Sequence, residues 1–233
     1  MLLSICIPTF NRAEQLDNCL NSILISQQKY KLHDFEVCIS DNNSKDNTKS
    51  IIEKYRTKLN INYSENSENI GFAKNAMKVV DLAKGKYSWI IGDDDLVLPD
   101  TFNILSKILK SNLNIEIFFL NSYYLNSDII SQSSKPFNTL ELQFINLQHL
   151  SKVKEDKIVH FWDLIDPNIS WEFLIGIFLI VFKTSKWIQS SKKVDIKKLD
   201  DKKIWSNFEN TCFFPVVNAY AFKNSKAYIC SRP

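Results

Sequence analysis

Three consecutive carboxylates, Asp93, Asp94 and Asp95, are the residues whose types and spacing most directly suggest chemistry. They follow an apolar run that ends at Ile91, which predicts that they lie at the end of a buried strand. Adjacent carboxylates repel each other, and a divalent cation shared among them would remove that repulsion. Mg²⁺ and Mn²⁺ favour such hard oxygen ligands. The alternative is a solvated acidic turn that caps a helix starting near Pro99, because carboxylates are favourable at helix N-termini.

Three other polar segments stand beside apolar runs and could contribute to the same site. They are Pro8-Thr9-Phe10-Asn11-Arg12, Asp41-Asn42-Asn43-Ser44 and Asn69-Ile70-Gly71-Phe72-Ala73-Lys74-Asn75. In a parallel sheet the carboxyl ends of the strands meet at one edge, where ligands bind. One ligand could therefore touch all four segments.

The elements that must position these segments alternate between strands and helices. Apolar runs predict strands over 2–7, 35–40, 61–63, 87–91 and 115–120. Helical spacing predicts helices over 13–26, 46–55, 72–84 and 99–111, the third closed by Gly85 as a C-cap. This alternation predicts an α/β fold class, with a mainly parallel, Rossmann-like open sheet flanked by helices.

The patterns weaken after Tyr124. We expect a loop or hairpin over 127–138, a helix over 140–163 and a buried strand over 173–182. A helix beginning near Pro215 and a last strand over 227–230 complete the chain. No helix follows that strand, so we expect the native protein to extend beyond Pro233.

Composition is ordinary for a globular protein of one large domain, with 233 residues, 45% of them apolar and 24% charged. A net charge of +3 is too small to indicate nucleic-acid binding. The apolar run over 173–182 is about half the length that spans a bilayer, and no secretory signal precedes the first strand. Five scattered cysteines predict reduced thiols in a cytoplasmic protein: Cys6, Cys19, Cys38, Cys212 and Cys230.

A lysine-rich segment over 183–203 allows two interpretations. Eight lysines against three aspartates leave it a net charge of +5, interleaved with apolar residues such as Trp187. It is either a solvated face or a peripheral contact with the anionic inner face of the plasma membrane.

The four polar segments, in order and spacing, resemble the family-2 glycosyltransferases of the GT-A fold. Those enzymes carry P-T-[YF]-N-R, D-[DN]-x-S-x-D-x-T, N-x-G-x-x-x-N and an acidic DxD-type motif followed by L-x-x-P. The second motif here is Asp41-Asn42-Asn43-Ser44-Lys45-Asp46-Asn47-Thr48. The resemblance covers residues 2 to about 125. Two of the motifs are most similar to the abequosyltransferase-like branch, which builds bacterial surface polysaccharides: Asn69-Ile70-Gly71-Phe72 and Gly92-Asp93-Asp94-Asp95.

This resemblance implies a metal-assisted, inverting transfer of a hexose-type sugar. The donor would be a UDP-, GDP- or CDP-linked sugar and the acceptor a glycan or lipid diphosphate, with Mn²⁺ or Mg²⁺ as cofactor. The resemblance also implies a nucleotide-sugar-binding half over 1–125 and a smaller acceptor-side half of the same domain over 126–233, truncated at its C-terminus.

The resemblance also implies individual donor contacts. Asp41 would accept a hydrogen bond from the base, Asp93 would bind ribose, and Asp94 would bind the metal and act in catalysis. Asp95 would be a second metal ligand or a support for the loop, and Gly92 departs from the family by replacing its first carboxylate. The remaining donor-binding candidates are Pro8, Thr9, Asn11, Arg12, Asn43, Asn69, Gly71, Lys74 and Asn75. Of these, Arg12 and Lys74 are alternatively solvated charges, and the asparagines alternatively hold their own loops.

An inverting transfer needs a general base, which the family often places in an acidic pair before a late helix. That position falls near Cys212 and Phe213, so the nearest carboxylate is Glu209, alternatively a surface residue. Further candidates are Glu172, Asp163, His160 and His149. A chain without a base would be a catalytically weak or inactive nucleotide-sugar-binding module. A nucleotidyltransferase is disfavoured because no Gly- and Arg-rich loop follows the first strand.

Overall fold

The computed structural model describes residues 1–133, 135–142, 147–169, 176–199 and 206–232. Eight strands form one sheet in the order β3-β2-β1-β4-β7-β5-β8-β6. The strands are β1 (Leu3–Thr9), β2 (Phe35–Asp41), β3 (Ile61–Glu65), β4 (Tyr87–Ile90), β5 (Ile117–Leu120), β6 (Lys157–His160), β7 (Ile180–Lys183) and β8 (Lys226–Cys230). The helices are α1 (Ala13–Tyr30), α2 (Thr48–Arg56), α3 (Phe72–Asp81), α4 (Thr101–Ser111), α5 (Ser127–Ser131), α6 (Thr184–Ser191) and α7 (Phe208–Phe222).

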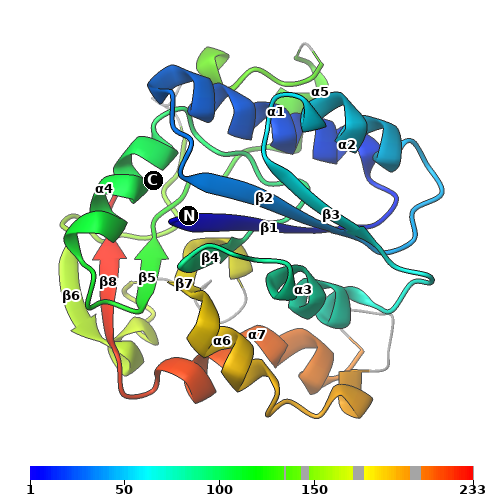
Figure 1. Ribbon diagram of the computed structural model, residues 1–233. Helices are drawn as coiled ribbons and strands as arrows, with labels where there is room; N and C mark the ends of the chain where they lie inside the picture. Colours follow the sequence, from blue (N-terminus) through cyan, green and yellow to red (C-terminus); the bar gives the residue numbers. More distant parts are fainter. Residues whose placement is uncertain (134, 143–146, 170–175, 200–205, 233) are drawn as a thin grey trace.

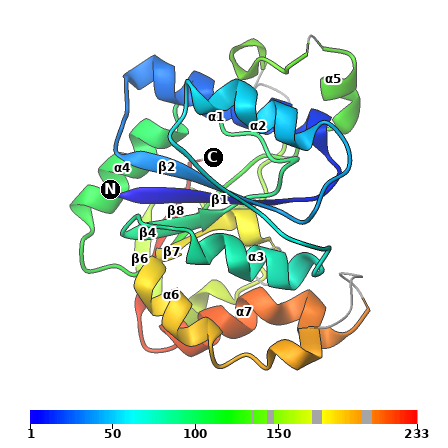
Figure 2. The same cartoon turned by 45° about the vertical axis from the view of Figure 1, so that its right-hand side comes forward.

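Helices cover both faces of the sheet, giving three layers (Figures 1 and 2). Side chains alternate along β1, so that Ile5 and Ile7 enter one core and Cys6 enters the other. The first core packs under α1, α2 and α4, and the second packs under α3, α6 and α7. Burial on both faces explains why these strands are nearly continuous apolar runs.

Parallel pairing aligns the strand ends that carry the polar segments. β1 pairs in parallel with both β2 and β4, and β2 with β3. In this register Thr9 lies opposite Asp41, and Asp41 lies opposite Glu65. The second half adds antiparallel pairs through β7 and β6, while β5 and β8 pair in parallel. The predicted α/β class with a GT-A-type open sheet is confirmed.

Gly85 has a different role from the predicted helix cap. α3 ends at Asp81, and Leu82 is its C-cap. The Gly85 amide donates to the Ser4 hydroxyl at 2.8 Å. A Cβ on Gly85 would lie 2.7 Å from backbone atoms of Leu3 and Ser4, which no side chain tolerates. The glycine therefore allows the chain to pass close to β1.

The second half departs from the sequence prediction in several places. The predicted helix over 140–163 is wrong: its last part contains β6, which pairs with β8 at the sheet edge. Residues 127–138 contain the short helix α5, capped by the Asn126 side chain, which accepts from the Asp128 amide. The strand predicted over 173–182 is shorter, because Ile177–Leu179 form a 3₁₀ turn before β7. Residues 173–175 of that prediction lie outside the described ranges.

The prediction placed the start of the last helix near Pro215, but the helix begins seven residues earlier, at Phe208. Asn207 caps it by accepting a hydrogen bond at 2.7 Å from the Asn210 amide, so Pro215 falls inside α7. An asparagine cap provides a helix start that does not need proline. The last strand, β8, is confirmed.

All five cysteines are free thiols, as expected. In the described parts of the chain, none of the helices is both long and apolar enough to cross a bilayer.

Lys183 and Lys186, the first two lysines of the basic segment, form an ion-pair cluster with Glu116. Glu116 accepts hydrogen bonds from Lys183 at 3.2 Å, from Ser225 at 2.8 Å and from Lys186. Burial raises the pKa of Glu116, but the bonds from Lys186, Ser225 and Lys183 outweigh it, so the net shift is downward. The cluster joins the start of β5 to β7, α6 and the turn before β8.

We expect Glu116→Gln to lower the free energy of unfolding by about 1–2 kcal/mol at pH 7, because charge-assisted hydrogen bonds are lost. The pKa of Glu116 is lower in the folded than in the unfolded chain. Its stabilisation is therefore present above the unfolded-state pKa and lost as pH falls through the folded-state value. Urea unfolding at pH 7 and pH 3 measures this, with the exposed Glu155→Gln as control. An equal loss of unfolding free energy at pH 7 and pH 3 would contradict a stabilising role for the ionised Glu116.

Candidate functional site

Arg12 lies at the centre of the polar edge of the sheet, where it joins two of the three consecutive carboxylates. Its Nη1 donates to Asp93 Oδ1 at 3.0 Å and to Asp94 Oδ2 at 2.7 Å. The hydrogen bond to Asp93 is the main reason that the pKa of Arg12 is raised. The repulsion that the sequence assigned to a divalent cation is thus offset by a guanidinium of the chain itself.

Asp93 ties the end of β1 to the acidic turn. It is 5% exposed, and its Oδ2 accepts a hydrogen bond at 2.8 Å from the Thr9 hydroxyl. Burial raises the pKa of Asp93, and the bonds from Thr9 and Arg12 offset this only in part. Both carboxylate oxygens have partners, so a contact with ribose requires an exchange of partners.

Asp95 closes the acidic turn rather than facing Arg12. Its Oδ2 accepts a hydrogen bond at 2.6 Å from the Gly92 amide, and its own amide donates to the Gly92 carbonyl at 3.2 Å. Burial, reinforced by the charges of Asp94 and Asp93, raises the pKa of Asp95 to about 7. A Cβ at position 92 would lie 2.5 Å from Asp94 Oδ1. Because that atom ends an exposed side chain that can turn away, this contact alone does not require glycine at position 92.

A divalent cation fits only part of the donor set predicted for it. Mg²⁺ and Mn²⁺ sites of this kind use one or two carboxylates together with substrate phosphates. Asp94 suits that role, because its side chain is 55% exposed at the edge of the sheet. Asp95 does not, because the Gly92 amide already occupies its Oδ2. Among the described residues, no group of three or more His, Cys, Asp or Glu is arranged to hold a metal ion.

Asp41 forms a second polar corner beside Thr9. It is 1% exposed, and its Oδ1 accepts from the Ser44 amide at 2.9 Å and from the Ser44 hydroxyl at 2.6 Å. Its Oδ2 accepts from the Tyr63 hydroxyl at 3.3 Å. Sequence reasoning missed Tyr63, although its place two residues before the end of β3, a neighbour of β2, could have indicated it.

The first two loops brace each other through asparagines in the left-handed conformation. Asn11 has φ 52° and Asn43 has φ 67°, values that asparagine tolerates better than most residues. Asn11 Oδ1 accepts from the Lys45 amide at 2.7 Å, and Asn43 Nδ2 donates to the Ser67 carbonyl at 3.0 Å. Both side chains therefore hold loop conformation, and Pro8 is buried within β1.

The loop before α3 is held by a buried amide network. Asn75 is 2% exposed and bonds to the hydroxyl and carbonyl of Ser40 and to Asn66, so it supports the loop. Asn69 accepts from the Gly71 amide and from Asn42 Nδ2. Gly71 has φ 83°, which requires glycine at the start of the helix. Sequence reasoning missed Asn42, which is 3% exposed, although Asn42 stands at the [DN] position of the second motif and Asn43 at its variable position.

Lys74 is half-buried in the first turn of α3.

The described candidate bases already have other partners. Glu209 lies in the first turn of α7, 3.8 Å from the Lys198 ammonium and 40% exposed. Asp163 accepts from the His160 amide at 2.9 Å, and the His149 ring contacts Tyr123. Glu172 lies outside the described ranges.

Comparisons with known proteins agree on one family. The family model described as glycosyl transferase family 2 matches residues 4–168. The abequosyltransferase RfbV of Salmonella typhimurium is 46% identical over 117 residues, which are 49% of this chain and 34% of that protein. An uncharacterized glycosyltransferase of Mycoplasma pneumoniae is 29% identical over 178 residues, which are 71% of this chain and 56% of that protein. The chain thus spans between a third and three fifths of the length of these relatives.

A solved structure supports the fold. Residues 1–349 of S. aureus TarS superpose with a TM-score of 0.71 at 19% identity, covering 100% of this chain and 59% of that one. The same protein in complex with UDP-GlcNAc gives a TM-score of 0.64 at 18% identity, covering 100% of this chain and 57% of that one.

We expect Asp95→Asn to keep the turn, because an amide oxygen can still accept from the Gly92 amide. Without metal at pH 8 the variant should be about 1–3 kcal/mol more stable than the parent, because a carboxylate whose pKa is raised by burial is destabilising when ionised. The gain should shrink as pH falls from the folded-state pKa of about 7 and disappear below the unfolded-state value, where Asp95 is protonated in both folded and unfolded chains. Asp95→Ala, which leaves the Gly92 amide without this acceptor, should be less stable than Asp95→Asn. Chemical unfolding measures the stability of both variants. If Asp95→Ala were more stable than Asp95→Asn, the turn-closing role of Asp95 would be refuted.

Proposed function

The chain belongs to glycosyl transferase family 2, and on that premise we propose that it transfers a sugar from a nucleoside-diphosphate sugar to a glycan or lipid-linked acceptor in bacterial surface polysaccharide synthesis. The observation that carries this proposal is the contact of Thr9 and Arg12 with Asp93 and Asp94, beside Asp41 at one sheet edge. It brings a cation, an exposed carboxylate and the buried carboxylate of Asp41 to one edge of the sheet. The UDP-GlcNAc complex of S. aureus TarS supports a UDP-linked donor as the first to test.

The nucleoside is proposed to lie along the loops after β1 and β2. Asp41 would accept the imide N–H of the base, at the corner that Ser44 and Tyr63 orient. Asp93 would reach the ribose by exchanging one of its present partners. The neighbouring residues Pro8, Thr9, Asn11, Asn43, Asn69 and Gly71 shape this part of the site.

The diphosphate is proposed to lie at Arg12. The guanidinium binds two carboxylates through Nη1. Its remaining N–H groups and its charge can bind a phosphate. Lys74, from the start of α3, is a second candidate phosphate contact. When bound, Mn²⁺ or Mg²⁺ held by Asp94 and the phosphates supplies Lewis-acid stabilisation of the departing nucleoside diphosphate.

Inversion requires a base that takes a proton from the acceptor hydroxyl. We propose Glu209 for this role, because it is the acidic residue nearest in sequence to the place where the family resemblance puts a base. Its pairing with Lys198 favours one alternative, a module that binds a nucleotide sugar and transfers it slowly or not at all. Release of nucleoside diphosphate that depends on added acceptor would separate a transferase from that module.

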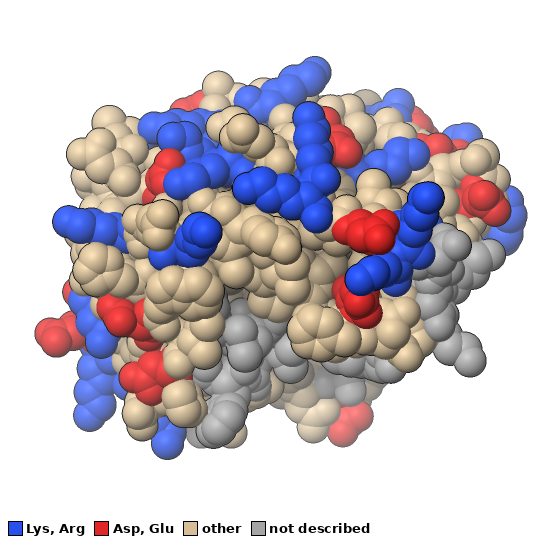
Figure 3. Space-filling model, turned by 90° about the horizontal axis from the view of Figure 1, so that it is seen from below, with Lys and Arg blue, Asp and Glu red and all other residues tan. Residues whose placement is uncertain are grey.

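The lysine-rich segment stays a weak candidate for membrane contact. Lys183 and Lys186 bind Glu116, Lys198 pairs with Glu209, and Lys193 lies 5.7 Å from the centre of the Tyr220 ring. Lys202 and Lys203 lie outside the described ranges. On the face seen from below, Lys and Arg side chains are spread among uncharged residues and interrupted by acidic ones (Figure 3). These pairings favour the solvated, ion-paired face.

We expect Asp94→Ala to lose Mn²⁺-dependent affinity for the donor nucleotide by at least about tenfold, because one charged ligand–metal contact is removed. Affinity without metal should change little, since Arg12 keeps its bond to Asp93. Calorimetry with UDP, GDP and CDP, with and without Mn²⁺, measures both values. Asp100→Ala, an exposed carboxylate on the same segment, is the control. Equal affinities of Asp94→Ala and parent in Mn²⁺ would remove Asp94 from the metal site.

We expect Asp41→Ala to weaken UDP binding by about 1–3 kcal/mol, the loss of a charge-assisted hydrogen bond. CDP should lose less, because cytosine carries no N–H at ring position 3. Asp41→Asn should be milder than alanine, since its amide oxygen still accepts. Glu65→Ala, opposite Asp41 on β3, is the matched control. If UDP and CDP weaken equally, Asp41 holds the loop without reading the base.

A further inference from the structure

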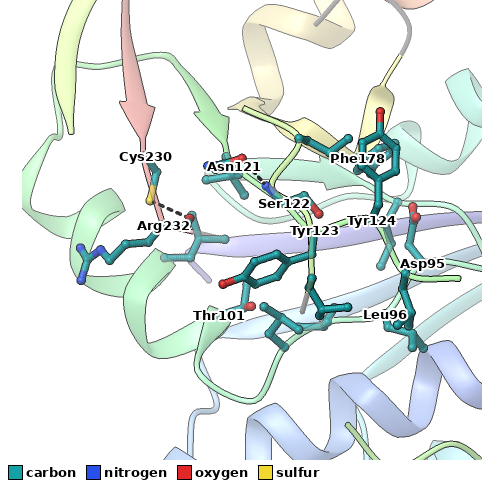
Figure 4. A pocket seen from close by; sticks show the side chains of 18 of the residues that line it. Asp95, Leu96, Thr101, Asn121, Ser122, Tyr123, Tyr124, Phe178, Cys230 and Arg232 are labelled. Atoms are coloured by element: carbon teal, nitrogen blue, oxygen red, sulfur yellow. Dashed lines mark hydrogen bonds between the residues drawn. The ribbon is translucent and has the colours of Figure 1, made fainter. Parts of the chain in front are cut away.

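A cavity of about 280 Å³ opens beside the acidic turn and is not used by the donor site described above. Asp94 and Asp95 belong to its wall. Figure 4 shows Asp95 and Leu96 at one end of the view, Cys230 and Arg232 at the other, and Tyr123 between them. The cavity lies within the core that packs under α4, which contributes three apolar side chains to its wall: Ile104, Leu105 and Ile108.

The lining of this cavity, here called the aliphatic pocket, is unlike a sugar site. Of the 24 described residues that line it, 12 are Leu or Ile. A sugar ring carries hydroxyls around its edge, and each would lose its hydrogen bonds with water against such a wall. Sugar hydroxyls need polar side chains at these positions, whereas an aliphatic chain needs none.

Two of the polar residues that line the aliphatic pocket away from Asp94 already have partners. Asn121 Oδ1 accepts from the Ser151 amide at 2.9 Å, and its Nδ2 donates to the Ser231 carbonyl at 2.9 Å. The Arg232 guanidinium lies 3.6 Å from the Asp156 carboxylate. The exposed carboxylate of Asp94 instead stands where the aliphatic pocket meets the donor site. One end of the cavity thus carries carboxylates and adjoins the proposed donor site, while Leu and Ile make up half of the lining residues.

We propose that the aliphatic pocket binds the hydrocarbon chain of the acceptor, isoprenoid or acyl, with the polar end of that molecule at Asp94. The proposal rests on the proposed function, because it takes the acidic turn to be the donor side. The volume is about twice the ~150 Å³ of an engineered apolar cavity that takes up benzene, so it suits a chain of about ten carbons. Removing such a chain from water favours binding about fourfold for each methylene.

Calorimetric titration of the intact chain with hexanol, octanol and decanol tests the pocket directly. Affinity should rise about fourfold per added methylene. Geraniol, a branched ten-carbon alcohol, distinguishes an isoprenoid from a linear acyl preference by its affinity relative to decanol. Saturating UDP should not displace either alcohol, because donor and chain occupy adjoining sites.

Two substitutions of one half-buried wall residue test the location. Ile104→Trp fills the aliphatic pocket and Ile104→Asp places a charge in its wall, so each should weaken decanol binding at least tenfold. The same replacements at the exposed Leu113 should leave it unchanged. UDP affinity should be the same in all four variants, which also reports that each is folded.

The two proposals fail in different ways. Absence of saturable decanol binding, affinity independent of chain length, or equal affinity in the Ile104 variants would overturn the aliphatic pocket. Displacement of decanol by a methyl glycoside would also overturn it, by assigning the cavity to a sugar. Loss of nucleotide binding with decanol binding retained would count against the proposed function alone.

Discussion

The attachment of Arg12 to Asp93 and Asp94 is the interaction on which the rest of the site depends. Asp93 and Asp94 follow β4, and both form ion pairs with Arg12, which follows β1. This is possible only because β1 and β4 are adjacent and parallel, which brings both strand ends to the same place. The buried Thr9 hydroxyl, which also bonds Asp93, fixes that carboxylate in position. A carboxylate as buried as Asp93 requires such partners.

The loops around this ion pair are ordered mostly by polar side chains that bond to one another and to backbone. Asn42 and Asn75 are buried, yet each makes several hydrogen bonds across segments far apart in sequence. Such a network rigidifies a loop only when every member is satisfied. The polar edge of the sheet is therefore preorganised, and preorganisation lowers the entropy lost when a ligand binds.

The sequence predicted the first half of the fold well, because its strands are buried on both faces and its helices have clear apolar spacing. It also predicted which segments meet, since the carboxyl ends of parallel strands share an edge. It did not predict that Arg12 would bind the acidic turn or that Asp95 would close it, because these depend on side-chain geometry. In the second half, β6 is an exposed edge strand with little apolar signal, and Pro215 suggested a helix start that Asn207 provides instead.

The position of β7 has a consequence for how the protein is made. β7 is formed by residues 180–183 but lies between β4 and β5, whose last residue is 120. A nascent chain that has emerged through β5 therefore has both β4 and β5 with unpaired edges, which favour pairing with other chains. At about 5–20 residues per second, roughly 60 more residues take several seconds to follow. The first 120 residues would therefore emerge as an aggregation-prone intermediate until β7 pairs with both edges.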